Sequence, residues 1–417
     1  MRRSVLMTFF LCMVFACQFA AAEDGFVSLF NGKDLTGWAA KSGDAKYFVD
    51  DGCIVGLVND EKRNSFLCTE KMFENFIFKC EFKFDRHVNS GLQFRSNARP
   101  PRDQREFDMG LEGREVVYGY QCELEPNGMT AAIFDESRRG WLTPPTPEFE
   151  AKTKEPFKQG EWNELEIQCV GPSIRTWLNG QPITDIFDTM TQKGFFGLQI
   201  HGARGNGQVR WRNIRIKELP PTPWKPFFKD KQFVDLEIKP AGKWEFIDDE
   251  TVHATSTPDE RRDGMALSKD VFDNFAVRVS FKRGKGNSGL YFRAHEIDAG
   301  HWLCGFQCEI EGNRAAGGLW EVGGGPIEKG RGWVFLPPEE NARNLKPTDW
   351  NDISAVAIGD RIVTNLNGKQ VVDLVDPDCL KNGKTGLQLH GGSDMEYWFR
   401  NYEIMPLSKE MVELITR

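Results

Sequence analysis

Short segments with a period of two recur along most of the chain. Residues 76–84 and 165–169 alternate apolar and polar side chains, and Gly, Asn, Asp and Pro separate such segments from their neighbours. This alternation predicts strands that bury one face and expose the other. Residues 178–183 hold an Asn-Gly pair between apolar positions, which is typical of a hairpin turn. Long helical patterns are missing, so the sequence predicts an all-β fold.

The same motifs occur twice in the same order, which indicates an internal duplication. The matching segments are 89–95 and 287–293, 119–125 and 305–311, and 197–202 and 386–391, at offsets of 198, 186 and 189 residues. Each copy has roughly 190 residues of short strands, which fit a two-sheet antiparallel sandwich of the jelly-roll kind. We therefore predict two tandem β-sandwiches.

The proline-rich segment 220–227 separates the two copies and is expected to be a stiff linker. The first domain is then predicted at 23–219 and the second at 228–408, followed by a C-terminal tail at 409–417.

The first 22 residues have the pattern of a secretory signal peptide. Two arginines precede an apolar run from Val5 to Ala16, and an Ala-x-Ala site ends at Ala22. The apolar run is too short for a stable membrane anchor, and no later stretch of the sequence is long enough to span a bilayer. We expect cleavage after Ala22 and export to the periplasm or the medium. A lipoprotein anchored through Cys17 is the less favoured alternative.

Charge and cysteine content restrict the partners and the compartment. The chain has 53 Lys and Arg residues against 61 Asp and Glu residues, a formal net charge of −8, so nucleic-acid binding is not expected. Eight cysteines follow the predicted signal peptide, and Cys80, Cys122, Cys169 and Cys308 alternate in register with apolar residues. Buried free thiols are the favoured interpretation, and Cys53–Cys68 is the one disulfide to test.

Amides, carboxylates, an arginine and a histidine share one face of three predicted strands. Because alternate residues of a strand point the same way, the candidate polar face of the first copy comprises Asn89, Gln93, Arg95, Gln121, Glu123, Glu125, Gln199 and His201. The second copy has Asn287, Arg293, Gln307, Glu309, Glu311, Gln388 and His390 at the matching positions. The alternative is an ordinary solvated sheet face. Recurrence of the same residue types in both copies favours a functional face.

Several residues of this face admit two interpretations. Glu123 and Glu125 form either a carboxylate pair or part of a wet surface, and His201 is either a general base, a metal ligand or a structural residue. Arg95 either neutralises a neighbouring glutamate or holds a substrate oxygen. Trp141, in an irregular segment, is either a platform for sugar stacking or a plug at the sandwich edge. Motifs of serine hydrolases, P-loop proteins and zincins do not occur.

The opening segment 26–38, FVSLFNGKDLTGW, resembles the start of the 3-keto-disaccharide hydrolase domain family. The similarity continues through the whole first copy, at 89–91, 119–121, 160–163, 177–180, 197–202 and 212–217. The second copy resembles the family more weakly, because it lacks the Asn-Gly-Lys-Asp-Leu run and retains only the interior motifs.

The resemblance implies a concanavalin A-like sandwich, export and cleavage of glycosides that carry a ketone at C3. It implies elimination after removal of the C2 proton, followed by addition of water. Our hypothesis from the shared strand face gives His201 or Glu123 the role of base, Arg95 that of enolate stabiliser, and Glu125 or Gln121 that of acid at the leaving group. Asn89, Gln93, Gln199 and Trp141 would then bind the glycoside or oligosaccharide.

Two other functions stay open on the sequence. Sandwiches of this class are also lectins, and tandem copies suit avid glycan binding. One catalytic and one binding domain is the third alternative. No cofactor is expected with certainty and no metal ligands are assigned; Ca²⁺ is a candidate because it is common in this fold, although no EF-hand loop occurs.

Overall fold

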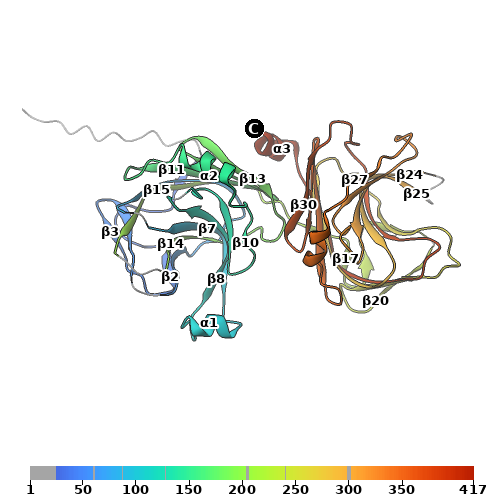
Figure 1. Ribbon diagram of the computed structural model, residues 1–417, viewed down its shortest axis with the longest axis horizontal. Coiled ribbons are helices and arrows are strands. Elements are labelled where there is room, and N and C mark those ends of the chain that lie inside the picture. The colour runs from blue at the N-terminus through green and yellow to red at the C-terminus, as the bar shows by residue number, and fades with distance from the viewer. Residues whose placement is uncertain are drawn as a thin grey trace, which may run out of the picture.

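The computed structural model describes residues 25–59, 62–86, 88–126, 128–202, 206–239, 241–297 and 302–417. The predicted signal peptide and Cys17 lie outside the described residues. Two β-sandwiches lie side by side, with the C-terminal helix α3 (Lys409–Thr416) at their junction (Figure 1). The prediction of two tandem all-β sandwiches is confirmed.

The first sandwich consists of two facing antiparallel sheets. Its outer sheet runs in the order β13 (Gln181–Phe187), β12 (Ser173–Leu178), β11 (Asn163–Val170), β6 (Asn75–Phe84), β15 (Gln208–Leu219), β4 (Cys53–Leu57) and β3 (Tyr47–Asp50), with β1 (Val27–Ser28) beside β15. The second sheet, here called the cleft sheet, runs in the order β10 (Gly140–Trp141), β9 (Ile133–Glu136), β8 (Val116–Leu124), β7 (Ser90–Arg99), β14 (Phe195–Ile200), β5 (Ser65–Thr69) and β2 (Trp38–Ser42). The short helices α1 (Gln104–Asp108) and α2 (Pro147–Lys154) lie in its connections.

The second sandwich repeats this arrangement. Its outer sheet runs β20 (Lys243–Phe246), β21 (Val252–Ser256), β32 (Met395–Pro406), β23 (Phe275–Lys285), β28 (Asn351–Ile358), β29 (Arg361–Leu366) and β30 (Lys369–Val375), with β16 (Lys225–Pro226) beside β32. Its cleft sheet runs β19 (Leu236–Ile238), β22 (Gly264–Ser268), β31 (Lys384–Leu389), β24 (Ser288–Ile297), β25 (Trp302–Ile310), β26 (Leu319–Val322) and β27 (Gly332–Phe335). A small sheet of β17 (Phe228–Lys229) and β18 (Gln232–Phe233) and the 3₁₀ helix Glu339–Asn344 complete the domain.

Alternation along the strands produces the two cores. On β6, Phe76, Phe78, Cys80, Phe82 and Phe84 all point between the sheets and are at most 1% exposed. Each buried phenylalanine contributes about 1.5–3 kcal/mol relative to exposure. The partners across the core come from the cleft sheet, whose other face is thereby left free for polar residues.

The eight cysteines of the described residues are buried free thiols, including Cys53 and Cys68. Cys80, Cys122, Cys169 and Cys308 lie in the cores as their register predicted. Burial raises the pKa of the Cys53 thiol, so this thiol stays protonated at neutral pH. The candidate Cys53–Cys68 disulfide is therefore not formed in this structure.

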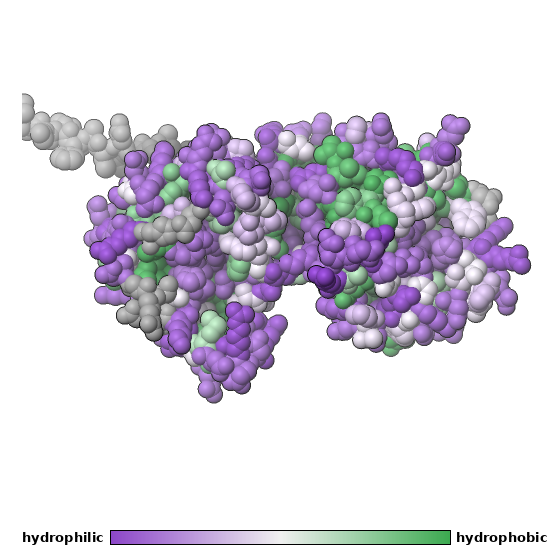
Figure 2. Space-filling model, in the orientation of Figure 1, coloured by the Kyte–Doolittle hydropathy of each residue, from purple (hydrophilic) through white to green (hydrophobic). Residues whose placement is uncertain are grey.

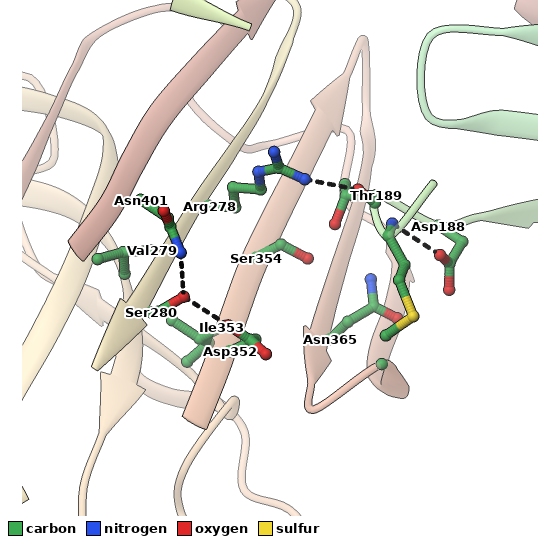
Figure 3. A pocket seen from close by; sticks show the side chains of 12 residues that line it. Asp188, Thr189, Arg278, Val279, Ser280, Asp352, Ile353, Ser354, Asn365 and Asn401 are labelled. Carbon is green, nitrogen blue, oxygen red and sulfur yellow. Dashed lines mark hydrogen bonds between the residues drawn. The ribbon is translucent and has the colours of Figure 1, made fainter. Parts of the chain in front are cut away.

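An apolar cluster joins the two domains at their outer sheets. It includes Val170 and Phe187 of the first domain and Val356, Met405 and Ile415 of the second. Beside it lies a polar cavity of about 320 Å³ between loop residues 188–190 and the second outer sheet (Figure 3).

Residues that line this cavity are joined to one another by hydrogen bonds. Ser280 donates to Asp352 at 2.5 Å and accepts from Asn401 at 3.1 Å, and Arg278 donates to the carbonyl of Thr189 at 2.9 Å (Figure 3). Of these bonds, the one from Arg278 to Thr189 joins the two domains, and the two at Ser280 lie within the second domain. Within the described residues, no helix is long and apolar enough to cross a membrane.

Candidate active site and its duplicate

A buried carboxyl group lies on the free face of the first cleft sheet. Glu123, on β8, is 4% exposed. Its Oε1 accepts a hydrogen bond from Asn89 Nδ2 at 2.6 Å, and its Oε2 accepts one from Gln121 Nε2 at 2.7 Å. Burial nevertheless raises the pKa of Glu123 to about 8, with a further contribution from the negative charge of Glu125. At neutral pH this carboxyl is therefore mostly protonated and able to donate a proton.

A chain of side-chain hydrogen bonds fixes the orientation of this glutamate. Ser96 donates to Gln93 Oε1 at 2.7 Å, and Gln93 Nε2 donates to Gln121 Oε1 at 2.6 Å. The side chain of Gln121 lies across Gly91, where a Cβ would come within 2.4 Å of Gln121 Cδ. Glycine at this position is thus required by the close approach of the amide, not by a turn.

Three buried polar atoms near this carboxyl have no hydrogen-bond partner among the described residues. They are Asn89 Oδ1, Gln199 Oε1 and His201 Nδ1. Gln199 lies near the end of β14, next to β7, and His201 follows at the strand end. Unpaired buried polar atoms are costly, at about 1–3 kcal/mol each. Hydroxyl groups of a bound molecule can satisfy all three.

Burial lowers the pKa of His201, and the charge of Glu125 opposes that shift only partly. The imidazole is therefore neutral at neutral pH and can accept a proton. The first site thus combines a protonated carboxyl with a neutral imidazole, the two states needed for an acid and a base at the same pH.

A second buried carboxyl, that of Glu136 on β9, was not among the predicted residues. Burial raises its pKa to about 7. Asn64 Nδ2 donates to Glu136 Oε1 at 3.4 Å, and Asn64 Oδ1 accepts from the backbone of Gly202 at 2.9 Å. The polar loop after β14 is thereby tied to β9 across the cleft sheet. Glu136 and Asn64 are 72 residues apart, so no local pattern could reveal the contact.

Arg95 does not lie with Glu123 and its amide donors, so the prediction that it shares their face of the sheet was wrong. Arg95 is fully buried, and its guanidinium donates to the carbonyls of Glu74 and Gly171 and to Asn75 Oδ1 at 2.8–3.0 Å. The register of β7 shifts between Phe94 and Asn97, and Arg95 has φ of +45°. This bulge breaks the alternation from which the shared face was predicted.

The counterpart Arg293 deviates in the same way. It is buried with φ of +47° and donates to the carbonyls of Gly359 and Asp273 at 2.8 and 3.1 Å. Both arginines therefore connect loops within their own domains, away from the glutamates.

Trp141 lies on β10, the edge strand of the first cleft sheet. Its ring packs edge-on against Phe134 with centroids 5.0 Å apart, and it borders residues 368–370 of the second domain. The neighbouring cleft, about 510 Å³, has a charged lining that includes Arg99, Glu106, Glu136 and Arg138.

The second domain repeats the glutamate and its amide donors. Gln307 Nε2 donates to Glu309 Oε1 at 2.8 Å, and Asn287 Nδ2 donates to Glu309 Oε2 at 3.2 Å. Burial raises the pKa of Glu309 to about 7. Gly289 underlies Gln307 as Gly91 underlies Gln121, with a Cβ distance of 2.5 Å to Gln307 Cγ.

A model of the 3-keto-alpha-glucoside-1,2-lyase-like domain family matches residues 25–217 and 223–405, one match for each sandwich. The chain belongs to this family. The resemblance noted in the sequence is thus confirmed for both copies, including the more divergent second one.

Relatives of this family member include carbohydrate-active proteins. A 3-keto-disaccharide hydrolase of Bacteroides thetaiotaomicron is 24% identical over 250 residues, covering 48% of this chain and 81% of that relative. Among solved structures, a candidate glycosyl hydrolase from Parabacteroides distasonis is 22% identical and covers 47% of this chain and 94% of its own, with a TM-score of 0.32. The carbohydrate-binding module CBM66 from Bacillus subtilis is 14% identical, with a TM-score of 0.30. The match covers 44% of this chain and 96% of that module.

The second cleft of this family member differs from the first in its remaining lining. Tyr291 stands where the first domain has Gln93, Asp263 where it has Asn64, and Val322 where it has Glu136, as the strand registers show. Gln388 Nε2 donates to Asp263 Oδ2 at 2.7 Å, so the amide is bound within the protein. The ring nitrogen Nδ1 of His390 lies 2.8 Å from the carbonyl of Gly391.

The predicted residues of the second copy, apart from Arg293, come together in one open cleft of about 570 Å³. This cleft is lined by Asn287, Gln307, Glu309, Glu311, Gln388 and His390, and also by Trp302, Trp320 and Trp333. The tryptophans, on β25, β26 and β27, were not predicted, because the candidate residues of the second copy were chosen as counterparts of the polar residues of the first. Within the described ranges, no group of three or more His, Cys, Asp or Glu side chains is placed to hold a metal ion.

Proposed function

We propose that this chain cleaves the glycosidic bond of 3-keto-glycosides and that the first cleft is the reaction site. The observation that supports this best is Glu123, a buried carboxyl with a raised pKa, beside three polar atoms that have no hydrogen-bond partner in the described part of the chain. The family membership and the relative from Bacteroides thetaiotaomicron point to the same substrate class.

The proposed reaction begins at C2, whose hydrogen is acidified by the adjacent ketone. His201, neutral because burial lowers its pKa, removes this proton. The electrons of the C2–H bond form a C1=C2 double bond, and the C1–O bond breaks with its electrons on the departing oxygen. Glu123 donates its proton to that oxygen. Addition of water, with hydroxide at C1 and a proton at C2, completes a net hydrolysis.

Substrate hydroxyl groups are assigned to the unpaired acceptors. Asn89 Oδ1 and Gln199 Oε1 can each accept from a sugar hydroxyl, which removes the cost of burying them alone. Gln93 and Gln121 do not need to touch the sugar in this proposal, because their amides orient Glu123. Arg95 has no part in the reaction, since its guanidinium is bound to the backbone.

The test uses a 3-keto-glucoside with a chromogenic aglycone and its unoxidised parent in D₂O. Release of the aglycone from the keto compound alone, with deuterium at C2 of the sugar product, is the expected result. Release from both compounds would contradict the need for the ketone. Release without deuterium at C2 would contradict elimination. Glu123→Gln, which keeps the size and an amide in place of the carboxyl, is the matched inactive control.

Export is a separate proposal that rests on residues 1–22. Expression of the full chain in a Gram-negative host should give a periplasmic protein that begins at Glu23. A lipid-modified Cys17 at the N-terminus would support the lipoprotein alternative, and an intact N-terminus in the cytoplasm would contradict export.

A further inference from the structure

The second cleft is lined by apolar as well as polar side chains. Besides the tryptophans, its apolar lining consists of Tyr291, Ile297, Leu303 and Val322. Tyr291 and Leu303 are the cleft-lining members of a buried cluster on the free face of the second cleft sheet. The amides and carboxylates around Glu309 lie in the same cleft. A molecule that fills it must therefore offer both hydroxyl groups and apolar faces.

Three tryptophans supply surfaces for such a molecule. Trp320 and Trp333 meet at 87° with ring centroids 5.2 Å apart, which makes a right-angled corner at the cleft. Trp333 and Trp302 are 38% and 42% exposed, unusually large fractions for rings of this size. An indole face that is held by a neighbouring ring and still open to solvent is suited to stacking on the C–H face of a sugar.

The apolar surface continues beyond the cleft. Phe335 lies two residues after Trp333 on β27 and is 38% exposed, and Leu336 is 40% exposed. Figure 2 shows hydrophobic side chains gathered on the second domain in the area of β27, a larger patch than any on the visible face of the first domain. An exposed apolar patch beside the cleft is a further surface that a bound molecule can contact.

The charged groups of the cleft favour a neutral molecule. Its described lining contains Asp263, Glu309, Glu311 and His390 but no lysine or arginine. The cleft next to the first site, in contrast, is lined by four arginines, at 99, 105, 138 and 139. An acidic glycan would meet carboxyl groups without a cation in the second cleft, so uncharged sugars fit it better.

We propose that the second cleft holds an uncharged oligosaccharide by stacking on Trp320 and Trp333, as a binding site separate from the reaction site of the first domain. This inference deepens the proposed function and rests on its assignment of carbohydrate as the substrate class. The polar end around Glu309 orients sugar hydroxyls, and the tryptophan corner holds the next ring. A glycan chain held in this way stays close to the protein, which raises the effective concentration of its free end at the reaction site of the first domain.

The experiment is calorimetric titration of the full chain with unoxidised maltohexaose and cellohexaose. The wild type should bind at least one of them, and Trp333→Ala should weaken that binding about tenfold or more. Trp398→Ala is the matched control, because Trp398 stacks on His253 at 4.8 Å on the outer sheet. It should bind as the wild type does. Trp333→Phe, which keeps a ring, should recover part of the affinity.

Four results would overturn the inference. Equal affinity of Trp333→Ala and wild type would exclude the tryptophan corner, as would equal losses in Trp333→Ala and Trp398→Ala. Absence of binding of both sugars at millimolar concentration would exclude this ligand class. Glu123→Gln separates the two proposals, because loss of sugar binding in that variant would place the sugar in the first cleft. Failure of keto-glucoside turnover with retained, Trp333-dependent binding would overturn only the proposed function.

Discussion

The two sites of this molecule share a glutamate with its amide donors and differ in the residues that line the space beside it. In both, a glutamate with a raised pKa accepts from one asparagine and one glutamine, and a glycine makes room for the glutamine. Next to the first site lies a cleft lined by Glu136 and four arginines, whereas the second cleft has Val322 and three tryptophans. The two copies have therefore retained the glutamate with its donors and differ in the other lining residues.

The two sites also differ in how many of their buried polar atoms have hydrogen-bond partners within the protein. In the first domain, Gln199 Oε1 and His201 Nδ1 have no partner among the described residues. In the second, Gln388 and Asp263 bond to each other. The first cleft thus has hydrogen-bonding capacity left for a ligand, while the second relies on its aromatic surface.

Loss of the carboxyl proton should have the largest effect on turnover. Glu123→Gln keeps the shape of the side chain and removes the acid, so kcat for a 3-keto-glucoside should fall on the order of 10³-fold, within the usual range for acid–base groups. Glu309→Gln is the matched change in the second cleft and should cause a much smaller loss. Equal losses, measured by aglycone release, would show that both clefts react.

Removal of the buried arginine should have the largest effect on folding. Arg95→Ala leaves two backbone carbonyls and Asn75 without their donor and should lower the free energy of unfolding by about 3 kcal/mol. Arg293→Ala should lower it less, because Arg293 Nε has no partner among the residues that the structure describes and burial depresses the pKa of that guanidinium. Urea denaturation measures both. A stable Arg95→Ala protein that has lost only activity would return Arg95 to the reaction site.

The raised pKa of Glu123 predicts a dependence of stability on pH. Its folded value, about 8, exceeds its ordinary value of 4.5. The group therefore contributes its full stability below about pH 4.5, and this is lost as pH rises through 8. Between pH 6 and pH 9 the wild type should lose on the order of 2 kcal/mol relative to Glu123→Gln. Parallel pH profiles of thermal unfolding for the two proteins would show that Glu123 ionises normally.

Filling the space under the glutamine should have the smallest effect on stability. Gly91→Ala places a Cβ 2.4 Å from Gln121 Cδ and must displace that amide, at a cost of about 1–2 kcal/mol. Turnover should fall as well, because Glu123 loses a donor. Gly289→Ala should cost a similar amount of stability without a comparable loss of turnover. A wild-type rate in Gly91→Ala would show that orientation by Gln121 is dispensable.

Much of the fold was predictable because it depends on local patterns. Alternation on β6 and the duplicated motifs are properties of neighbouring residues, and they gave the strands, the sandwiches and their number. The shared face of Asn89, Gln121 and Glu123 also followed from alternation, and the hydrogen bonds of Glu123 agree with it. The same rule failed at Arg95, where a one-residue bulge turns the side chain away.

The sequence by itself thus determined the class of fold, the duplication and the residue types available on one face of each cleft sheet. Only the tertiary structure decided which of them are buried together and with what pKa. The contact of Asn64 with Glu136 and the pairing of Gln388 with Asp263 join segments separated by 72 and 125 residues. The physical reason is that desolvation and hydrogen bonding depend on every neighbour in space, whereas periodicity reports only the neighbours along one strand.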